Sequence, residues 1–244
     1  ATQCDVIATS LPTPETFEKV ILGKDGVLEG VRAGQIIVDL GTTDPMTIER
    51  VANAVREKGV QVLDAPVSGG MKGAEEGTLT IMVGGDKQSF DKCAEMFNSI
   101  GKTVYYIGGL GTGATVKIVN NIMTLVNIAT FVEALAIGVR YGLDLKKLYE
   151  VVKNSSGTSR IFERKWAEHI SKADYEPGFK IELAQKDLLL ALRMSKDLKV
   201  PLFMTSTAVQ VYELARAKGL TDKDTTGLIR LFEELGKIRF DARA

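Results

Sequence analysis

Short apolar runs in the first half of the chain constrain the fold most strongly. They lie at residues 5–11, 35–40, 61–65, 79–83 and 103–107. Several are nearly continuous and rich in β-branched residues, which is what strands buried on both faces of a parallel sheet require. Helical patterns separate them. Asp44-Pro45, for example, supplies an N-cap and a proline at the first helical position of a helix that we expect to run to Lys58. This half therefore predicts βαβ units.

The second half is helical to its end. Of the 24 glycines, 17 fall in residues 1–113, and the remainder of the chain is poor in turn signals. A long apolar helix is expected at 117–141, where Gly142 ends it, and Asp144 caps the next one. Further helices are expected at 160–172, 181–198 and 201–218, with a loop at 173–179 and a last helix opened by Thr221-Asp222. We predict an α/β fold with a parallel-sheet domain at 1–112 and an all-α domain at 113–244.

Composition excludes several classes of function. Lys plus Arg is 31 and Asp plus Glu is 31, so the neutral chain lacks the charge that nucleic acid or an anionic membrane would attract. Two cysteines, Cys4 and Cys93, and one histidine, His169, exclude a disulfide framework and a Cys/His zinc site. This cysteine usage fits a reducing compartment, so we expect a cytoplasmic protein without a bound metal.

The segment 118–139 has the length of a membrane span, but it carries polar residues. At about 100° per residue, Lys117, Asn121 and Thr124 fall on one stripe of this helix. An apolar helix with a single polar stripe is typical of a central helix buried against others, with the stripe facing a cleft. We therefore interpret it as a core helix and expect no membrane partner.

Two places in the chain could carry chemistry, and each has a plain structural alternative. In Asp64-Ala65-Pro66-Val67-Ser68-Gly69-Gly70, small residues after a strand could expose N–H groups to an anion, or could form a glycine turn without a ligand. Lys117, with Asn121 one helical turn later, could be a solvated surface lysine. Partial burial near a helix N-terminus would instead move its ammonium toward acid/base use.

Three other features receive structural interpretations. Residues 109–114 match G-x-G-x-x-G/A, but a long helix follows in place of a second strand, so the loop fails the test for a dinucleotide fingerprint. We expect its glycines to permit close approach of sheet and helix. Lys186-Asp187 alone suggests a solvated helix face, and His169 a surface or hydrogen-bonded side chain.

Taken together, four motifs resemble the β-hydroxyacid dehydrogenase family in order and spacing. The family includes 3-hydroxyisobutyrate dehydrogenase, tartronate semialdehyde reductase and the glyoxylate/succinic semialdehyde reductases. The motifs are Asp64–Gly70, then Gly77-Thr78-Leu79 with Met82-Val83-Gly84-Gly85, then Gly111-Thr112-Gly113 with Lys117 and Asn120-Asn121, and finally Lys186-Asp187-Leu188. The resemblance spans essentially the whole chain.

The resemblance implies a Rossmann-type domain that binds NAD or NADP, followed by a helical domain like that of 6-phosphogluconate dehydrogenase. It also implies a small carboxylate substrate and a homodimer or homotetramer assembled through the helical domain. Lys117 becomes the catalytic acid/base and Asn121 the residue that orients the substrate. Its carboxylate is held by Ser68, Gly69 and Gly70. The cofactor lies near Leu11, Pro12, Thr42 and Lys186.

The chain departs from the family pattern at its start. The strand–GxGxxG–helix–strand segment that opens the family's Rossmann domain is not seen in these residues, so we expect an incomplete sheet with an open edge. Two alternatives to an active enzyme follow: an inert oligomerisation or binding module, and a receptor for small acids without turnover. NAD cannot be told from NADP, because the contact to the ribose lies in that segment.

Overall fold

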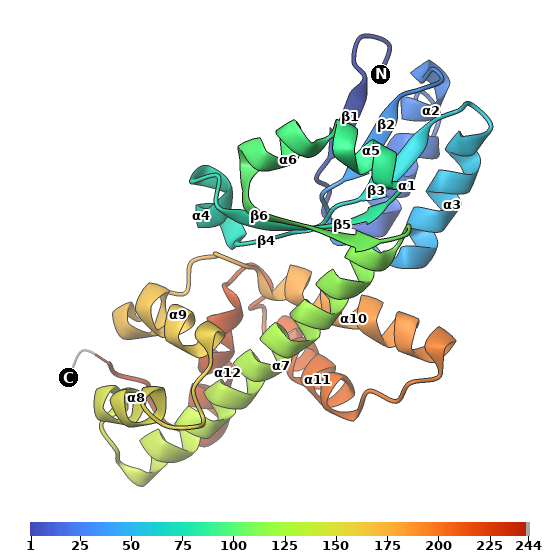
Figure 1. Cartoon of the computed structure of the whole chain (residues 1–244). Coiled ribbons are helices and arrows are strands. Elements are labelled where there is room, and N and C mark those ends of the chain that lie inside the picture. Colours follow the sequence, from blue (N-terminus) through green and yellow to red (C-terminus); the bar gives the residue numbers. More distant parts are fainter. Residues whose placement is uncertain (243–244) are drawn as a thin grey trace. The chain divides into compact units, whose positions relative to one another are not determined.

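The computed structural model describes residues 1–242 and divides the chain into two compact units, Ala1–Asn120 and Asn121–Ala244. Figure 1 labels their helices and strands. The dividing point lies inside the long helix α7 (Thr112–Tyr141), which begins in the first unit and continues through the second. The boundary expected from the sequence, at residues 112 and 113, lies at the first turn of the same helix.

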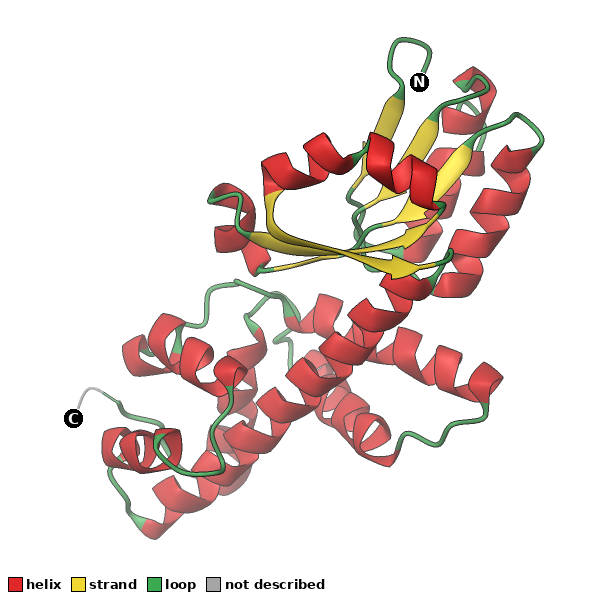
Figure 2. Cartoon of the chain, in the orientation of Figure 1, coloured by secondary structure: helices red, strands yellow, loops and turns green. Residues whose placement is uncertain are grey.

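A six-stranded sheet forms the first unit (Figure 2). The strands run in the order β1-β2-β3-β5-β4, and β6 also pairs with β5. Their bounds are β1 (Val6–Thr9), β2 (Ile36–Asp39), β3 (Gln61–Asp64), β4 (Val67–Ser68), β5 (Leu79–Gly85) and β6 (Gly101–Gly108). The five expected runs are all strands, and the α/β class is confirmed.

The sheet is mixed, which corrects the expectation of a purely parallel one. β1, β2 and β3 are parallel, but β5 runs antiparallel to β3 and to β4. The reason is local: after β3 the chain enters β4, which pairs along β5, and only the short helix α4 (Gly70–Glu75) separates them. A parallel return would need a full crossover helix in that connection. β5 and β6 are again parallel to each other.

Both faces of the central strands are covered, as their continuous apolar runs predict. On one face Ile37 and Val62 pack with α1 (Pro14–Leu22) and α3 (Pro45–Arg56). On the other, Ile36, Val38 and Leu63 pack with Phe97 and its neighbours from α5 (Lys87–Lys92) and α6 (Ala94–Ile100). Successive side chains of a strand point to opposite faces, so each buried strand contributes to both cores. The short α2 (Val27–Gly30) completes this unit.

Local capping signals located the starts of two helices correctly. Asp44 accepts a hydrogen bond from the Thr47 backbone N–H at 2.9 Å, and α3 begins at Pro45 as predicted. It ends at Arg56, slightly before the expected Lys58. In the second unit, Asp144 caps α8 (Leu145–Lys153) in the same manner.

The second unit is all-helical. Besides α7 and α8, it contains α9 (Arg160–Glu168), the 3₁₀ turn η1 (Ile170–Lys172), α10 (Ile181–Leu198), α11 (Phe203–Ala217), the 3₁₀ turn η2 (Thr225–Gly227) and α12 (Leu228–Gly236). α10 has its expected bounds. The helix expected at 160–172 is broken at His169, whose φ of −129° is not helical. Its last turn is η1.

The last helix was predicted wrongly to open at Thr221-Asp222. α12 begins at Leu228 instead, after η2. Residues 221–223 instead bind the start of α10. The Ile181 N–H donates to the Lys223 carbonyl at 2.9 Å, and the Glu182 N–H donates to the Thr221 carbonyl at 3.2 Å. The Thr221 and Lys223 carbonyls thus accept hydrogen bonds from α10 and not from a following helical turn, so the last helix begins later.

α7 is buried along one side only. Leu125, Ile128 and Val132 are fully buried in the core of the helical unit, whereas Met123 and Ile137 are about 70% exposed. By length and composition, α7 is also the one helix among residues 1–242 that could cross a membrane. Core helices of soluble proteins pass the same test, so this is weak evidence.

Candidate functional site

The loops after β1 and β2 meet at the carboxyl ends of two parallel strands. The Leu40 N–H donates to the Thr9 carbonyl at 2.7 Å, and a Cβ on Gly41 would lie 3.1 Å from the Leu11 carbonyl oxygen. The loop of Leu11 and Pro12 therefore lies beside the loop of Thr42. This edge is where open α/β sheets bind nucleotides, and the threonine adds a hydroxyl donor, so these residues fit a nicotinamide cofactor. Their contact with one remains a prediction.

A buried carboxylate that sequence reasoning missed ties these two loops together. Asp39, 1% exposed, accepts hydrogen bonds from the hydroxyls of Thr9 at 3.1 Å and Thr43 at 2.6 Å, and from the Gly41 N–H at 3.1 Å. A signal existed in the sequence, since an apolar strand that ends in Asp39, two residues before Gly41-Thr42-Thr43, places a carboxylate near backbone and hydroxyl donors. It did not identify which donors.

The predicted carboxylate-binding segment is a hairpin-like turn in the first unit. Ser68 is half-buried and pairs with Thr80 across β4 and β5. Gly69 and Gly70 follow with φ values of +145° and +70°. Residues with a side chain rarely adopt a backbone with such positive φ values. A Cβ on Gly69 would also lie 2.9 Å from Leu79 Cδ2. The two glycines are thus required by the turn, and their contact with an anion stays a prediction.

Residues 109–114 lead from β6 into the first turn of α7, and the close approach expected of their glycines is confirmed at Gly113. A Cβ there would lie 2.7 Å from the Asp64 carbonyl oxygen, so α7 can begin against β3 only without a side chain. The Asp64 carboxylate accepts the Gly111 N–H at 2.8 Å and the Ala114 N–H at 2.7 Å. Burial raises the pKa of Asp64 to about 6, although these N–H donors lower it.

Lys117 and Asn121 lie one turn apart on α7, and both are buried, at 9% and 4% exposure. The solvated-surface interpretation of Lys117 is therefore wrong. Its expected place at the opening of the helix also needs correction, because α7 begins at Thr112 and the lysine lies in the second turn. The helix begins earlier than expected because the Asp64 carboxylate, which comes from β3, accepts the Gly111 and Ala114 N–H groups at its start.

In the helical unit, Asn121 is oriented by a carboxylate that the sequence suggested was solvated. The Asn121 side-chain amide donates to Asp187 Oδ2 at 2.6 Å, and the Asp187 side chain is 3% exposed. The neighbouring Lys186 ammonium lies 3.0 Å from Asp187 Oδ1 and is 19% exposed. The pair is thus largely buried on α10, and helical spacing alone could not reveal the contact of Asp187 with Asn121. The cofactor contact of Lys186 remains a prediction.

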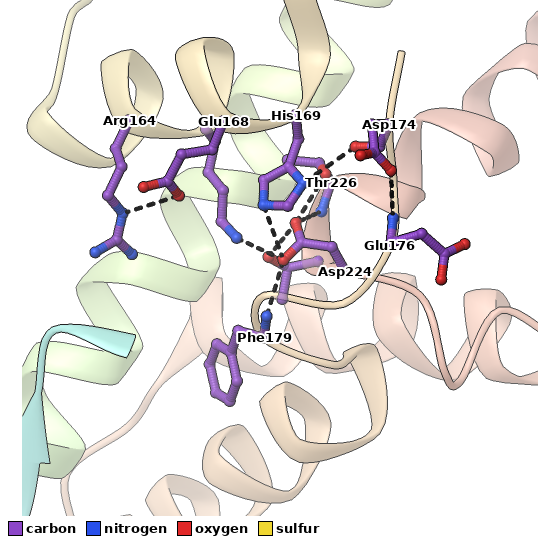
Figure 3. A network of polar contacts seen from close by, with 10 residues as sticks. Arg164, Glu168, His169, Asp174, Glu176, Phe179, Asp224 and Thr226 are labelled. Carbon is purple, nitrogen blue, oxygen red and sulfur yellow. Dashed lines mark hydrogen bonds and ion pairs between the residues drawn. The ribbon is translucent and has the colours of Figure 1, made fainter. Parts of the chain in front are cut away.

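A second buried polar cluster lies in the helical unit, away from the predicted site residues in sequence (Figure 3). The Lys165 ammonium lies 2.6 Å from Asp224 Oδ2, with 3% and 0% of the two side chains exposed. His169 is satisfied, as one alternative had it: its Nδ1 lies 3.0 Å from the Asp174 carbonyl and its Nε2 3.6 Å from Asp224. We call Lys165, His169 and Asp224 the buried ion cluster.

The buried ion cluster fixes the loop that leads into α10. The Phe179 N–H donates to Asp224 Oδ2 at 2.9 Å, while the Thr226 N–H and hydroxyl donate to Oδ1 at 2.9 and 2.8 Å. Desolvation alone would raise the pKa of Asp224, but the Lys165 ammonium and the Thr226 N–H outweigh it, and the pKa lies below its usual value. Desolvation lowers the pKa of Lys165. Among residues 1–242, no group of three or more His, Cys, Asp or Glu is arranged to hold a metal.

Two family models match the chain in succession. One, described as the NAD binding domain of 6-phosphogluconate dehydrogenase, covers residues 1–108. The other, described as NAD-binding of NADP-dependent 3-hydroxyisobutyrate dehydrogenase, covers residues 111–232. Their boundary falls in the loop that precedes α7.

Named relatives match over nearly the whole chain. It is 43% identical to 2-(hydroxymethyl)glutarate dehydrogenase of Eubacterium barkeri, over 96% of this chain and 78% of that protein. It is 37% identical to 2-hydroxy-3-oxopropionate reductase of Escherichia coli, over 94% and 78%. Among solved structures, 3-hydroxyisobutyrate dehydrogenase from Salmonella typhimurium superposes with a TM-score of 0.86 at 29% identity, over 95% of this chain and 80% of that one.

These matches agree with the fold and with the order of the motifs along it. The matches extend over both units, so the relationship is not confined to a nucleotide-binding domain of a kind that many enzymes share. The chain belongs to the 3-hydroxyisobutyrate dehydrogenase family of NAD(P)-dependent hydroxyacid dehydrogenases.

Proposed function

We propose that this enzyme transfers a hydride between NAD(P) and a small β-hydroxy acid or the matching semialdehyde. The names of the relatives support this class. 2-(Hydroxymethyl)glutarate and 2-hydroxy-3-oxopropionate both carry a carboxylate with an alcohol or aldehyde group on the carbon two bonds away. A site for such substrates needs a fixed anion contact and a proton donor or acceptor at the second oxygen.

Lys117 is the residue that carries the proposal. Its ammonium donates a proton to the substrate oxygen as a carbonyl is reduced, and the amine accepts that proton when the alcohol is oxidised. The bound nicotinamide supplies the hydride chemistry, and the protein aligns the reacting atoms. The supporting observation is that Lys117 is 9% exposed and lies one turn from Asn121 on the polar stripe of α7, whereas most lysines are solvent-exposed.

Other residues bind and orient. Asn121, on the same face of α7 and itself held by Asp187, keeps the substrate oxygen in place. Ser68, Gly69 and Gly70 hold the carboxylate. Leu11, Pro12, Thr42 and Lys186 contact the cofactor. The idea of an inert binding module has no comparable support.

The test follows the absorbance of NADH and NADPH with a panel of candidate acids. The panel contains 2-(hydroxymethyl)glutarate, 2-hydroxy-3-oxopropionate, 3-hydroxyisobutyrate, L-serine, glyoxylate and succinic semialdehyde. We expect turnover with at least one of them, and a fall in kcat of at least about 100-fold in Lys117→Ala, the usual contribution of a general acid. Lys24→Ala, at an exposed lysine of the same unit, is the matched control and should keep full activity. Wild-type kcat in Lys117→Ala would refute the mechanism.

We also propose that copies of the chain assemble through the helical unit. Met123, Ile137 and Tyr141 are 71%, 72% and 85% exposed, and at 100° per residue they lie within about 40° of one another on α7. An apolar stripe of this length is typical of a surface covered by a partner. Light scattering coupled to gel filtration should give the mass of a dimer or tetramer. A monomer mass at all concentrations would contradict the assembly.

A further inference from the structure

Asp64 is a buried carboxylate to which the proposed reaction assigns no role. It ends β3 and is 1% exposed, yet its two side-chain oxygens accept N–H groups from a distant part of the chain, those of Gly111 and Ala114. These N–H groups belong to the start of α7, where a helix has no partners of its own for them. A negative charge also complements the positive end of the helix dipole. Asp64 therefore holds the beginning of α7.

Two glycines let α7 come close enough for this contact. A Cβ on Gly84 would lie 2.7 Å from Asp64 Oδ1, and a Cβ on Gly113 would lie 2.7 Å from the Asp64 carbonyl oxygen. Real Cβ atoms essentially never lie so close to such atoms. We call Asp64, Gly84 and Gly113 the α7 socket. It fixes the first turn of α7 against the ends of β3 and β5.

The α7 socket connects two parts of the proposed machinery within the first unit. Lys117 follows Ala114 by three residues, about 4.5 Å along the helix axis, so a shift of the first turn moves the lysine with it. The backbone of Asp64 continues directly into residues 65–70. There the Pro66 carbonyl accepts the Met82 N–H at 3.1 Å, and Ser68 pairs with Thr80.

We propose that Asp64 is a positioning residue for Lys117. Its side chain sets where α7 begins, and its backbone sets where the Ser68–Gly70 turn begins, so this one residue fixes the acid/base relative to the carboxylate contact. The inference rests on the proposed function. It assigns to Asp64 the placement of Lys117, which the proposed roles of Lys117 and Ser68 do not explain.

The test compares Asp64→Ala and Asp64→Asn in the full-length protein. We expect kcat to fall about 100-fold in Asp64→Ala, as a misplacement of about 1 Å can produce, with the KM for the cofactor unchanged. The kcat of Asp64→Asn should lie between those of the wild type and Asp64→Ala, because the asparagine amide oxygen can still accept one N–H. The isotope effect with deuterated NAD(P)H should rise, because hydride transfer becomes slower. Hydrogen exchange should accelerate at residues 111–117 and stay unchanged in β2.

The controls separate positioning from general damage. Asp144→Ala removes the carboxylate that caps α8, and should leave kcat unchanged. Gly113→Ala displaces the start of α7 while keeping the carboxylate, and should repeat the loss of kcat and the faster exchange. If Asp64→Ala does not fold, Asp64→Asn and Gly113→Ala decide the question.

Two results would overturn the inference: a folded Asp64→Ala with wild-type kcat, or a loss of kcat without faster exchange at residues 111–117. Neither result would contradict the proposed function. That would fail in a different way, through a wild-type protein that transfers no hydride, or through a fully active Lys117→Ala.

Discussion

Removing the Lys165 ammonium should destabilise the helical unit strongly. The substitution Lys165→Met keeps most of the apolar stem and deletes the charge that lies 2.6 Å from Asp224. Asp224 is 0% exposed, so water cannot replace the ammonium, and the carboxylate keeps the donors of Phe179 and Thr226 and the His169 ring 3.6 Å away. A buried charge left without its partner is among the few causes of very large losses in stability.

The size of the effect follows from the geometry. Two unit charges 2.6 Å apart attract by about 6 kcal/mol at an effective dielectric constant of about 20. Part of this attraction only offsets the desolvation of both ions, and removal of one partner of a buried pair costs about 3–5 kcal/mol. We expect a loss in this range at pH 7. With a urea m-value near 2 kcal/mol/M, the unfolding midpoint would fall by about 2 M.

The protein carries its own probe for this measurement. Trp166 is the single tryptophan, lies next to Lys165 on α9, and stacks on Tyr149 with ring centres 4.1 Å apart. Its fluorescence during urea unfolding therefore reports the helical unit alone. Lys180→Met is the matched control, because Lys180 lies 2.7 Å from Asp222 but that pair is solvent-exposed. The control should leave the midpoint unchanged, as surface ion pairs contribute little.

The double variant Lys165→Met/Asp224→Asn should be more stable than Lys165→Met, because the uncompensated charge is removed as well. A midpoint for Lys165→Met close to that of Lys180→Met would refute the argument, and so would a double variant that is less stable than the single one.

Two further predictions concern pH and helix capping. The pKa of Asp224 lies below its unfolded value of 3.8, so its contribution to stability is present above that value and is lost as the pH falls through the folded pKa. Lys165→Met raises the folded pKa, so urea midpoints measured from pH 7 downward should begin to fall at a higher pH than in the wild type; coincident curves would contradict this. Asp44→Ala removes the cap of α3, where the carboxylate accepts the Thr47 N–H and hydroxyl, and should cost about 1 kcal/mol. Circular dichroism during urea unfolding measures it, and a loss below the error of the fit would count against the cap.

Local signals in the sequence determined much of this protein. Apolar runs with β-branched residues became the strands, and Asp44 and Asp144 placed their helix starts because a capping bond involves residues only three apart. The four ordered motifs identified the family. They also singled out Lys117 and Asn121, which the structure shows to be buried.

Only the tertiary structure decided which distant groups meet. The Asp64 contact with Ala114 spans 50 residues, Lys165 with Asp224 spans 59, and Asn121 with Asp187 spans 66. The late start of α12 has the same origin. In each case a backbone or side-chain group is held by a partner far along the chain, and patterns of nearby residues contain no record of that partner. Propensity and capping act within a turn or two of chain, whereas burial brings together whichever polar groups must satisfy one another once water is excluded.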